Sequence, residues 1–512
     1  MKNLIGYRKN LIRIYFLIII SLVFLFGIGF LVGGKNSFYK KLLRSDYSDY
    51  NVVVISLTAL RPDHLSFNDY TFNDYKRVTS PNIDNLARHS LIFRNAYTVA
   101  SWTLPSGISL FSGLYPFTHG VMNRNDGSYL NEETITIIEV LKALGYKTAA
   151  FTGGFDYDPI FGLTNRFEKN FYSEPMRSRK WKMTNYDKNF GKIASSTKEA
   201  IDWLKVRQTS KPFFLFIQGY DTHCPFTPNG KGGIFDPLYE NKNNIDFSGC
   251  IQTRSSSQPK EINSEKIWQV FSVVKIGQKP ETLFLTNRDI EHLVALYDEE
   301  IYEADKNTGN LLETIKELGM DKNTIIILLS EHGDYLGENG QFMRGGSIIG
   351  TFGEEAMRIP LIISIPNVQP KVFDQLVSIV DMAPTIADIL GVNFKTTQGI
   401  SFYPLIRDNA KKVREAVYGG SIFSPRINNF FFKEKSITEM IKEGNWKLIK
   451  EVIFNSSNGF IEEKYKLYNL QKDPNENISI ASDYPSIVKD LKEKLNVWRK
   501  SVAPKEDEED NK

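Results

Sequence analysis

The chain has 512 residues, of which 41% are hydrophobic and 24% charged, and its net charge is +3. This length allows one large domain with an appendage, or two to three domains, of ordinary globular composition. The nearly balanced charge and the lack of a basic cluster argue against nucleic acid as a partner. Cys224 and Cys250 show no CxxC spacing, which argues against a thiolate metal site and a disulfide framework. We expect two unrelated thiols; the alternative is one disulfide in an oxidising compartment.

The amino-terminal region contains one long apolar segment. Residues Ile14 to Val32 carry no charge, and at about 1.5 Å per residue they would span roughly the hydrocarbon core of a bilayer. The downstream sequence "FLVGGKNSFYKK" offers no good signal-peptidase site. We therefore predict a short segment 1–13 and a transmembrane signal anchor at 14–34, with a cleaved signal peptide as the alternative. The predicted location is the cell membrane, single-pass, with the large domain extracytoplasmic. Basic residues on both sides of the segment mean that the positive-inside rule barely favours one orientation.

Beyond a polar spacer, apolar strand-like runs alternate with amphipathic helical patterns. The helical patterns include "PNIDNLARHS", "EETITIIEVLKALGY" and "DIEHLVALYDEEIYEADKNTGNLLETIKELG". This alternation predicts an α/β fold in which a mostly parallel sheet is sandwiched by helices. The strand-like runs are 52–57, 148–152, 213–218, 324–329 and 361–365.

Composition divides the chain into a large and a small part. We predict a catalytic domain over 50–400, and a smaller C-terminal α+β subdomain over 401–502, where shorter strands and a final helix follow. Residues 227–286 are rich in Asn, Gly, Ser, Gln and Lys, which is typical of a functional lid or a disordered insertion. Residues 503–512 read as a disordered acidic tail.

The segment "SWTLPSGISLFSGLYPFTHG" carries the strongest local signal for chemistry. Thr103 precedes a proline in the first turn of a predicted helix, Pro105 to Leu114. A hydroxyl at this place faces free backbone N–H groups and the positive end of the helix dipole, which suits an anionic ester. Thr103 is thus a candidate nucleophile; the alternative is that it only caps the helix.

Two further segments place polar side chains just after strands. In "TIIILLSEHGDYLGENG", Glu331 and His332 follow a buried strand at once, and these residue types are typical metal ligands. In "FFLFIQGYDTHCPFTP", a strand runs into Asp221 and His223. The alternatives are a structural histidine in the first segment and a turn with a capping aspartate in the second.

Together these segments resemble the sulfatases of the alkaline phosphatase superfamily, particularly the membrane-anchored branch near the phosphoglycerol and phosphoethanolamine transferases. The matches occur in family order over about residues 50 to 500. They include "NVVVISLTALRPDHLSF" with "TSPNIDNLA", "SWTLPSGISLFSGLYPFTHGV", "YDTHCPFTP", "YDEEIYEAD", "NTIIILLSEHGDYLGENG", "EEAMRIPLIISIP", "VSIVDMAPTIADILG", "GISFYPLI" and "KLYNLQKDPNENISI". The resemblance implies an alkaline-phosphatase-like fold.

The resemblance also assigns roles to residues. It implies that Thr103 is the nucleophile and that His223 contacts the substrate. It places the metal ligands at Glu331, His332, Thr58 and Thr103. Arg344 stands where relatives carry a substrate-binding His or Lys.

This chain departs from the family pattern at three of its site positions. Thr58 replaces an acidic metal ligand, Glu331 is one methylene longer than the usual Asp, and Gly107 replaces an Arg or His beside the nucleophile. Asp63 does not substitute for Thr58, because the family carries that acid as well. Since affinity for a divalent cation depends on carboxylate ligands, we expect a degenerate site that binds one Ca, Mg or Mn ion weakly or not at all.

The nucleophile bears on the chemistry. Main-type sulfatases convert a Cys or Ser into formylglycine, and Thr103 in "TLPSG" cannot be converted in this way. We therefore expect no formylglycine, and we favour phosphoryl or phosphoglycerol-type transfer over sulfate ester hydrolysis.

The sequence predicts a membrane-anchored hydrolase or transferase that acts on sulfate or phosphate esters through a metal-assisted Thr nucleophile. Its expected partners are an anionic ester, such as a cell-envelope glycan or lipid, and the membrane. The alternative is a catalytically inactive relative that binds an anionic ligand or a partner at the membrane.

Overall fold

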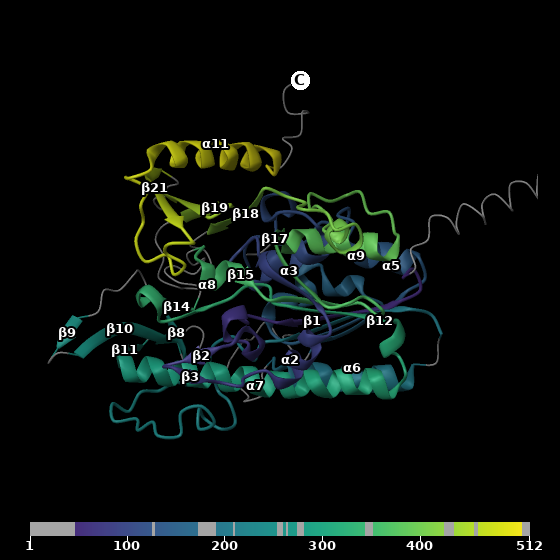
Figure 1. Ribbon diagram of the computed structural model, residues 1–512, viewed down its shortest axis with the longest axis horizontal. Coiled ribbons are helices and arrows are strands. Elements are labelled where there is room, and N and C mark those ends of the chain that lie inside the picture. Colours follow the sequence, from purple (N-terminus) through teal and green to yellow (C-terminus); the bar gives the residue numbers. More distant parts are fainter. Residues whose placement is uncertain are drawn as a thin grey trace, which may run out of the picture.

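The computed structural model describes residues 47–124, 128–172, 191–207, 210–252, 260–262, 265–273, 281–343, 352–423, 435–454 and 459–503. Within these ranges the chain forms a large α/β body, with a smaller sheet and a long helix at its carboxyl-terminal side (Figure 1). The predicted mostly parallel sheet between layers of helices is confirmed.

The central sheet has nine strands in the order β15-β4-β16-β12-β1-β7-β5-β6, with β17 paired to β4. Strands β1, β12, β7, β5 and β6 run parallel to one another, whereas β16 is antiparallel to β12 and to β4. The strands are β1 (Asn51–Leu57), β4 (Leu91–Tyr97), β5 (Lys147–Thr152), β6 (Lys169–Tyr172), β7 (Phe213–Gly219), β12 (Thr324–Leu329), β15 (Arg358–Ile359), β16 (Leu361–Ser364) and β17 (Lys371–Ser378).

Helices cover both faces of this sheet (Figure 1). One face packs against α2 (Pro81–Arg88), α6 (Ile193–Val206) and α7 (Asn287–Glu317), and the other against α3 (Thr103–Ser112), α5 (Ile137–Ala143) and α9 (Met382–Leu390). Strand β1 shows why both faces are covered: Val52 and Val54 belong to one core, while Val53, Ile55 and Leu57 belong to the other. A strand that is buried on both faces reads as a continuous apolar run, which is the pattern that predicted it.

The remaining elements are an insertion, a carboxyl-terminal part and a few short segments. The insertion before α7 is not only polar loop, because it forms a four-stranded sheet of its own. Its strands are β8 (Cys250–Gln252), β9 (Lys260–Ile262), β10 (Glu265–Val273) and β11 (Glu281–Thr286). The carboxyl-terminal part has β18 (Ala416–Phe423), β19 (Lys435–Glu443), β20 (Trp446–Phe454), β21 (Phe460–Asn469) and α11 (Pro485–Ser501). The short elements are β2 (Thr71–Phe72), β3 (Tyr75–Lys76), α4 (Pro116–His119), β13 (Tyr335–Leu336), β14 (Phe342–Met343), α8 (Glu354–Met357) and α10 (Tyr403–Arg407).

The two cysteines form a disulfide, so the expectation of two unrelated thiols is wrong. Cys224 and Cys250 have their Cα atoms 5.0 Å apart, a separation that a disulfide bridges. The bond joins the loop after β7 to the first strand of the insertion. The 26-residue separation in sequence gave no sign of this proximity.

The predicted membrane location is wrong. The finding that contradicts it is that no helix in the described ranges is long and apolar enough to cross a bilayer. The segment 14–34 that motivated the prediction lies outside the described residues. Hydropathy and length, on which the prediction rested, are properties of a local sequence window and do not by themselves establish a spanning helix.

Candidate active site

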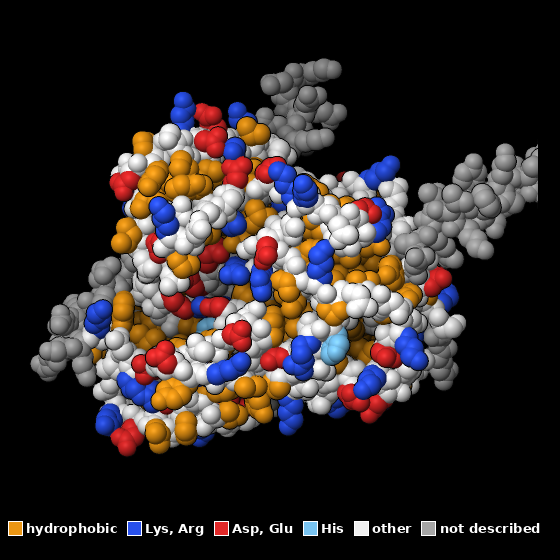
Figure 2. All heavy atoms as spheres, viewed as in Figure 1, with side chains coloured by type: hydrophobic (Ala, Val, Ile, Leu, Met, Phe, Trp, Pro, Cys, Tyr) orange, Lys and Arg blue, Asp and Glu red, His pale blue; other side chains and the backbone are white. Residues whose placement is uncertain are grey.

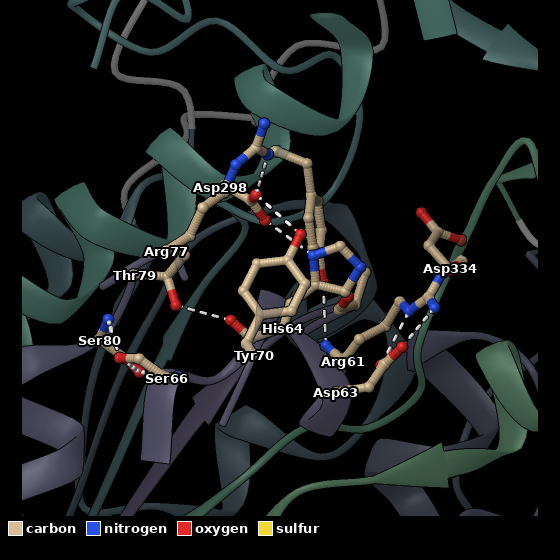
Figure 3. Close-up of polar contacts among 12 residues, drawn as sticks. Arg61, Asp63, His64, Ser66, Tyr70, Arg77, Thr79, Ser80, Asp298 and Asp334 are labelled. Carbon is tan, nitrogen blue, oxygen red and sulfur yellow. Dashed lines mark hydrogen bonds and ion pairs between the residues drawn. The ribbon is translucent and has the colours of Figure 1, made fainter. Parts of the chain in front are cut away.

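The turn after β1 positions Thr58 at the carboxyl edge of the sheet, and buried polar contacts hold this turn on α7. Asp298 of α7 accepts hydrogen bonds from the Tyr70 hydroxyl at 2.9 Å and from Arg77 at 2.5 Å, and it lies 2.7 Å from His64 Nδ1 (Figure 3). The Asp298 side chain is fully buried. Since a buried charge is tolerated only when paired, these contacts fix the turn that follows Thr58.

Thr103 and His332 come from different elements and meet in the interior. Thr103 is the first residue of α3 and His332 follows β12. The Thr103 Oγ1 and His332 Nε2 atoms are 3.2 Å apart, and both residues are fully buried. His332 Nδ1 lies 2.7 Å from the Gly333 carbonyl oxygen, which can only accept, so a neutral His332 carries its proton on Nδ1. Its Nε2 atom then carries no proton and can accept one from the Thr103 hydroxyl.

Glu331, beside His332, is held by hydroxyl groups. The Tyr157 hydroxyl donates to its Oε1 at 2.6 Å, and the Thr58 hydroxyl donates to its Oε2 at 3.0 Å. Gln218 Nε2 in turn donates to Thr58 Oγ1 at 2.7 Å. Burial raises the pKa of Glu331 above its usual range, while the two hydroxyl donors oppose that rise. Burial and the nearby Glu331 together raise the pKa of Tyr157, which remains a neutral donor.

Gly107 makes room for Tyr157. A Cβ atom at Gly107 would lie 2.5 Å from the Tyr157 hydroxyl oxygen, which is far inside a van der Waals contact. The Arg or His that the family carries at this position would therefore displace the tyrosine. Gly107, Tyr157 and Glu331 form one interdependent set.

His223 lies at the edge of this group, and Asp221 does not join it. The His223 and His332 rings are 6.3 Å apart between centroids, and His223 is partly exposed. Asp221 Oδ2 accepts the backbone N–H of Ile193, the first residue of α6, at 2.7 Å. Burial raises the pKa of Asp221 to about 6. This contact agrees with the alternative interpretation, in which Asp221 is a capping residue.

A second carboxylate, Asp156, is linked to Thr103 through Tyr220. Arg124 binds it through Nε at 2.5 Å and Nη2 at 2.6 Å. The Tyr220 hydroxyl donates to Asp156 Oδ2 at 2.9 Å and also hydrogen-bonds Thr103. Burial and Asp156 raise the pKa of Tyr220, so its hydroxyl keeps its proton.

The structure thus brings Thr58, Thr103, His223, Glu331 and His332 to one edge of the sheet, whereas Arg344 lies outside the described residues. Sequence reasoning missed five polar contributors: Arg124, Asp156, Tyr157, Gln218 and Tyr220. Asp156 and Tyr157 follow the end of β5, and Gln218 and Tyr220 lie at the end of β7. The rule that pointed to the other strand ends could have found these four. Arg124 lies in a loop and gave no signal.

A hydroxyl paired with an imidazole at the carboxyl edge of a mostly parallel sheet is an arrangement suited to a hydrolase that cleaves esters. Comparison with known proteins identifies the family to which the chain belongs. The sulfatase family model matches residues 51–392, more than half of the chain, and the model of the N-sulphoglucosamine sulphohydrolase C-terminal region matches residues 351–501. The chain therefore belongs to the sulfatase family, whose hydrolases act on sulfate esters.

Individual relatives agree with this assignment. The chain is 25% identical to arylsulfatase K of Bos taurus over 439 residues, which cover 82% of this chain and 76% of the relative. It is 23% identical to an arylsulfatase of Clostridium perfringens over 496 residues, covering 88% and 93%. The solved structure of a 2-O GAG sulfatase superposes with a TM-score of 0.65 at 17% identity, covering 89% of this chain and 92% of that one. The membrane-anchored branch suggested by the sequence is not shown.

The expectation that formylglycine plays no part is wrong for this family, because its arylsulfatases use formylglycine together with a divalent metal ion. The aldehyde is installed after synthesis, so the encoded residue letters of a chain do not display it. The prediction relied on such letters alone.

The residues at the expected metal position do not fit a divalent ion in this arrangement. No group of three or more His, Cys, Asp or Glu side chains within the described ranges is placed to hold one. Both oxygens of Glu331 accept hydrogen bonds from hydroxyls, and His332 Nε2 faces Thr103. A divalent cation requires several oxygen or nitrogen lone pairs directed at one point.

Proposed function

We propose that the chain hydrolyses sulfate esters, with Thr103 as nucleophile and His332 as the base that accepts its proton. The observation that carries this proposal is the 3.2 Å contact between Thr103 Oγ1 and His332 Nε2. The Gly333 carbonyl holds the other ring nitrogen and so fixes both the ring orientation and the acceptor on Nε2. A nucleophile, a base and a group that orients the base are the three parts of an activated hydroxyl.

The reaction runs in two displacements at sulfur. In the first, Thr103 Oγ1 bonds to sulfur, its proton moves to His332 Nε2, and the bond between sulfur and the ester oxygen breaks. The imidazolium then returns the proton to the departing alcohol. In the second, water attacks sulfur and gives a proton to His332, the bond between sulfur and Thr103 breaks, and the threonine oxygen regains a proton as sulfate leaves. Free N–H groups at the start of α3 stabilise the negative oxygens throughout.

The proposed substrate is a sulfated glycan, with His223 contacting it from the partly exposed side of the site. The match to an N-sulphoglucosamine sulphohydrolase region and the likeness to a 2-O GAG sulfatase support this class. Phosphate esters are the second chemistry to test, because a phosphothreonine can be discharged by attack of water at phosphorus. Because a sulfated glycan is negatively charged, the site needs a group that binds this anion.

Steady-state kinetics on 4-nitrophenyl sulfate, 4-nitrophenyl phosphate and sulfated glucosamine test the proposal. We expect wild-type turnover to fall by about a thousandfold or more in Thr103→Ala, because the nucleophile is lost, and by less in Thr103→Ser, which keeps a hydroxyl. Thr134→Ala, which removes a hydroxyl outside the site, is the control. Turnover by Thr103→Ala equal to that of wild type would refute the nucleophile.

A second candidate function is binding of an anionic ligand without turnover. The observation that favours it is burial: Thr103, Glu331 and His332 each have no exposed surface. In this case inorganic sulfate should raise the melting temperature while none of the three esters is hydrolysed. Hydrolysis that depends on Thr103 would exclude this candidate.

A further inference from the structure

The described contacts of Glu331 are with hydroxyl groups and include no Lys or Arg side chain. Gly107 has no side chain, and the Tyr157 hydroxyl occupies the space where one would begin. Thr58 and Gln218 are neutral. An anionic ester nevertheless has to be attracted and held against the field of Glu331, and this requires a positive group close to the nucleophile.

Arg124 is placed to supply that charge. Its guanidinium lies 5.5 Å from the ring centroid of Trp102, the residue directly before Thr103, and 4.8 Å from the ring centroid of Phe155. Asp156 binds it through two nitrogen atoms, at 2.5 and 2.6 Å. A bidentate contact of this kind fixes the plane of a guanidinium as well as its position.

The exposure of the pair shows which partner can meet a ligand. The Arg124 side chain is 24% exposed, whereas that of Asp156 is fully buried. The carboxylate therefore anchors the guanidinium from the interior, while part of the Arg124 side chain reaches solvent. Figure 2 shows Lys and Arg side chains scattered among acidic ones on the face in view.

Tyr220 connects this pair to the nucleophile. Its proton is donated to Asp156 at 2.9 Å, so the Tyr220 oxygen and His332 Nε2 are two alternative acceptors for the single Thr103 proton. Gly154 permits this position: its φ is +73°, and a Cβ atom there would lie 2.2 Å from the Tyr220 ring. The chain of contacts from Arg124 through Asp156 and Tyr220 thus ends at Thr103.

We propose that Arg124 recognises the sulfate or phosphate oxyanion of the substrate, and that Asp156 and Tyr220 are positioning residues for Arg124 and for the Thr103 hydroxyl. This inference rests on the proposed function and names the group that binds its anion. Arg124 replaces, from a loop, the positive side chain that position 107 does not provide.

Isothermal titration of the full chain with inorganic sulfate and inorganic phosphate tests the inference. We expect Arg124→Gln to weaken anion binding by about tenfold or more, because a charge-assisted hydrogen bond is lost. Arg124→Lys keeps the charge but not the bidentate geometry, so its binding should be weakened to an intermediate degree. In the ester assay, KM should rise more than kcat falls in both variants. The matched control is Arg94→Gln, an exposed arginine 3.6 Å from Asp374, which should bind anions like wild type.

The outcomes separate this inference from the proposed function. Thr103→Ala should bind sulfate like wild type, since Thr103 acts in turnover. Binding by Arg124→Gln within twofold of wild type, or no anion binding by wild type, would overturn the role of Arg124 and leave the Thr103 assay to decide the nucleophile. If Arg124→Gln does not fold, as judged by circular dichroism, Arg124→Lys decides: binding equal to wild type would overturn the inference.

Discussion

Two buried carboxylates belong to the site, and their partners differ. Asp156 accepts from Tyr220 and is paired with Arg124. Glu331 accepts from Tyr157 and Thr58 but has no cationic partner among these contacts, and burial raises its pKa. Both sides thus use a tyrosine to direct a carboxylate. Only the Asp156 side carries a guanidinium that an anion can reach, so the difference assigns anion recognition to that side.

Breaking the Asp156 side should have the largest effect on stability. Asp156→Ala leaves Arg124 without its bidentate partner and Tyr220 without its acceptor. We expect the free energy of unfolding to fall by about 2–3 kcal/mol, less than for a fully buried pair because water reaches part of Arg124. Urea denaturation measures this, with Asp374→Ala at the exposed Arg94 pair as a control that should change stability by less than about 1 kcal/mol. Equal losses in the two variants would mean that the Asp156 pair does not hold the site together.

Adding a charge on the Glu331 side should have the next largest effect. Thr58→Asp places a second carboxylate next to Glu331 and removes a hydroxyl donor. In the presence of a metal chelator, we therefore expect the free energy of unfolding to fall by about 2 kcal/mol. Calcium, magnesium or manganese should restore much of this loss, because a divalent ion balances two adjacent carboxylates. Thermal denaturation of Thr58→Asp and of wild type, each with and without the ion, measures this effect. An identical metal response in both proteins would show that position 58 does not adjoin the Glu331 carboxylate.

The pH dependence of stability gives the smallest of these effects. An acid whose folded pKa is raised binds more protons when folded, so it stabilises below its unfolded pKa and loses that contribution as pH rises through the folded pKa. For Glu331 the loss begins above its ordinary value of 4.5. Glu331→Gln should therefore flatten the fall in unfolding free energy between pH 5 and 8, by at most about 1.4 kcal/mol per pH unit. Curves for wild type and variant that stay parallel over this range would mean that Glu331 does not take up a proton on folding.

The sequence predicted the fold well where burial imposes a pattern. Strands β1, β5, β7, β12 and β16 lie within one residue of their predicted bounds, because a strand covered on both faces must be apolar throughout. Strand β4 was missed because its burial is interrupted at Arg94 and Asn95. The short strands of the insertion were missed because their polar composition gives no apolar pattern that would indicate strand pairing. The Cys224–Cys250 bond depends on a contact that no local pattern encodes.

The site was predictable to the extent that strand ends meet at one edge. Thr58, Glu331 and His332 were found in this way, whereas Thr103 was found from its place at the start of a helix and Gly107 from the family resemblance. Tyr157 fills the space at Gly107 and Arg124 approaches from a loop. Both placements depend on packing between segments that are distant in sequence, which the spacing of residues along the chain does not reveal.

The central claim, that Thr103 is the nucleophile, can be tested by mass spectrometry of the chain quenched in acid during turnover of a sulfate ester. We expect one added sulfonate group on the peptide that contains Thr103, formed more slowly in His332→Ala because the base that accepts the Thr103 proton is lost, and absent in Thr103→Ala. Product formation without modification at Thr103, together with undiminished turnover by Thr103→Ala, would contradict it.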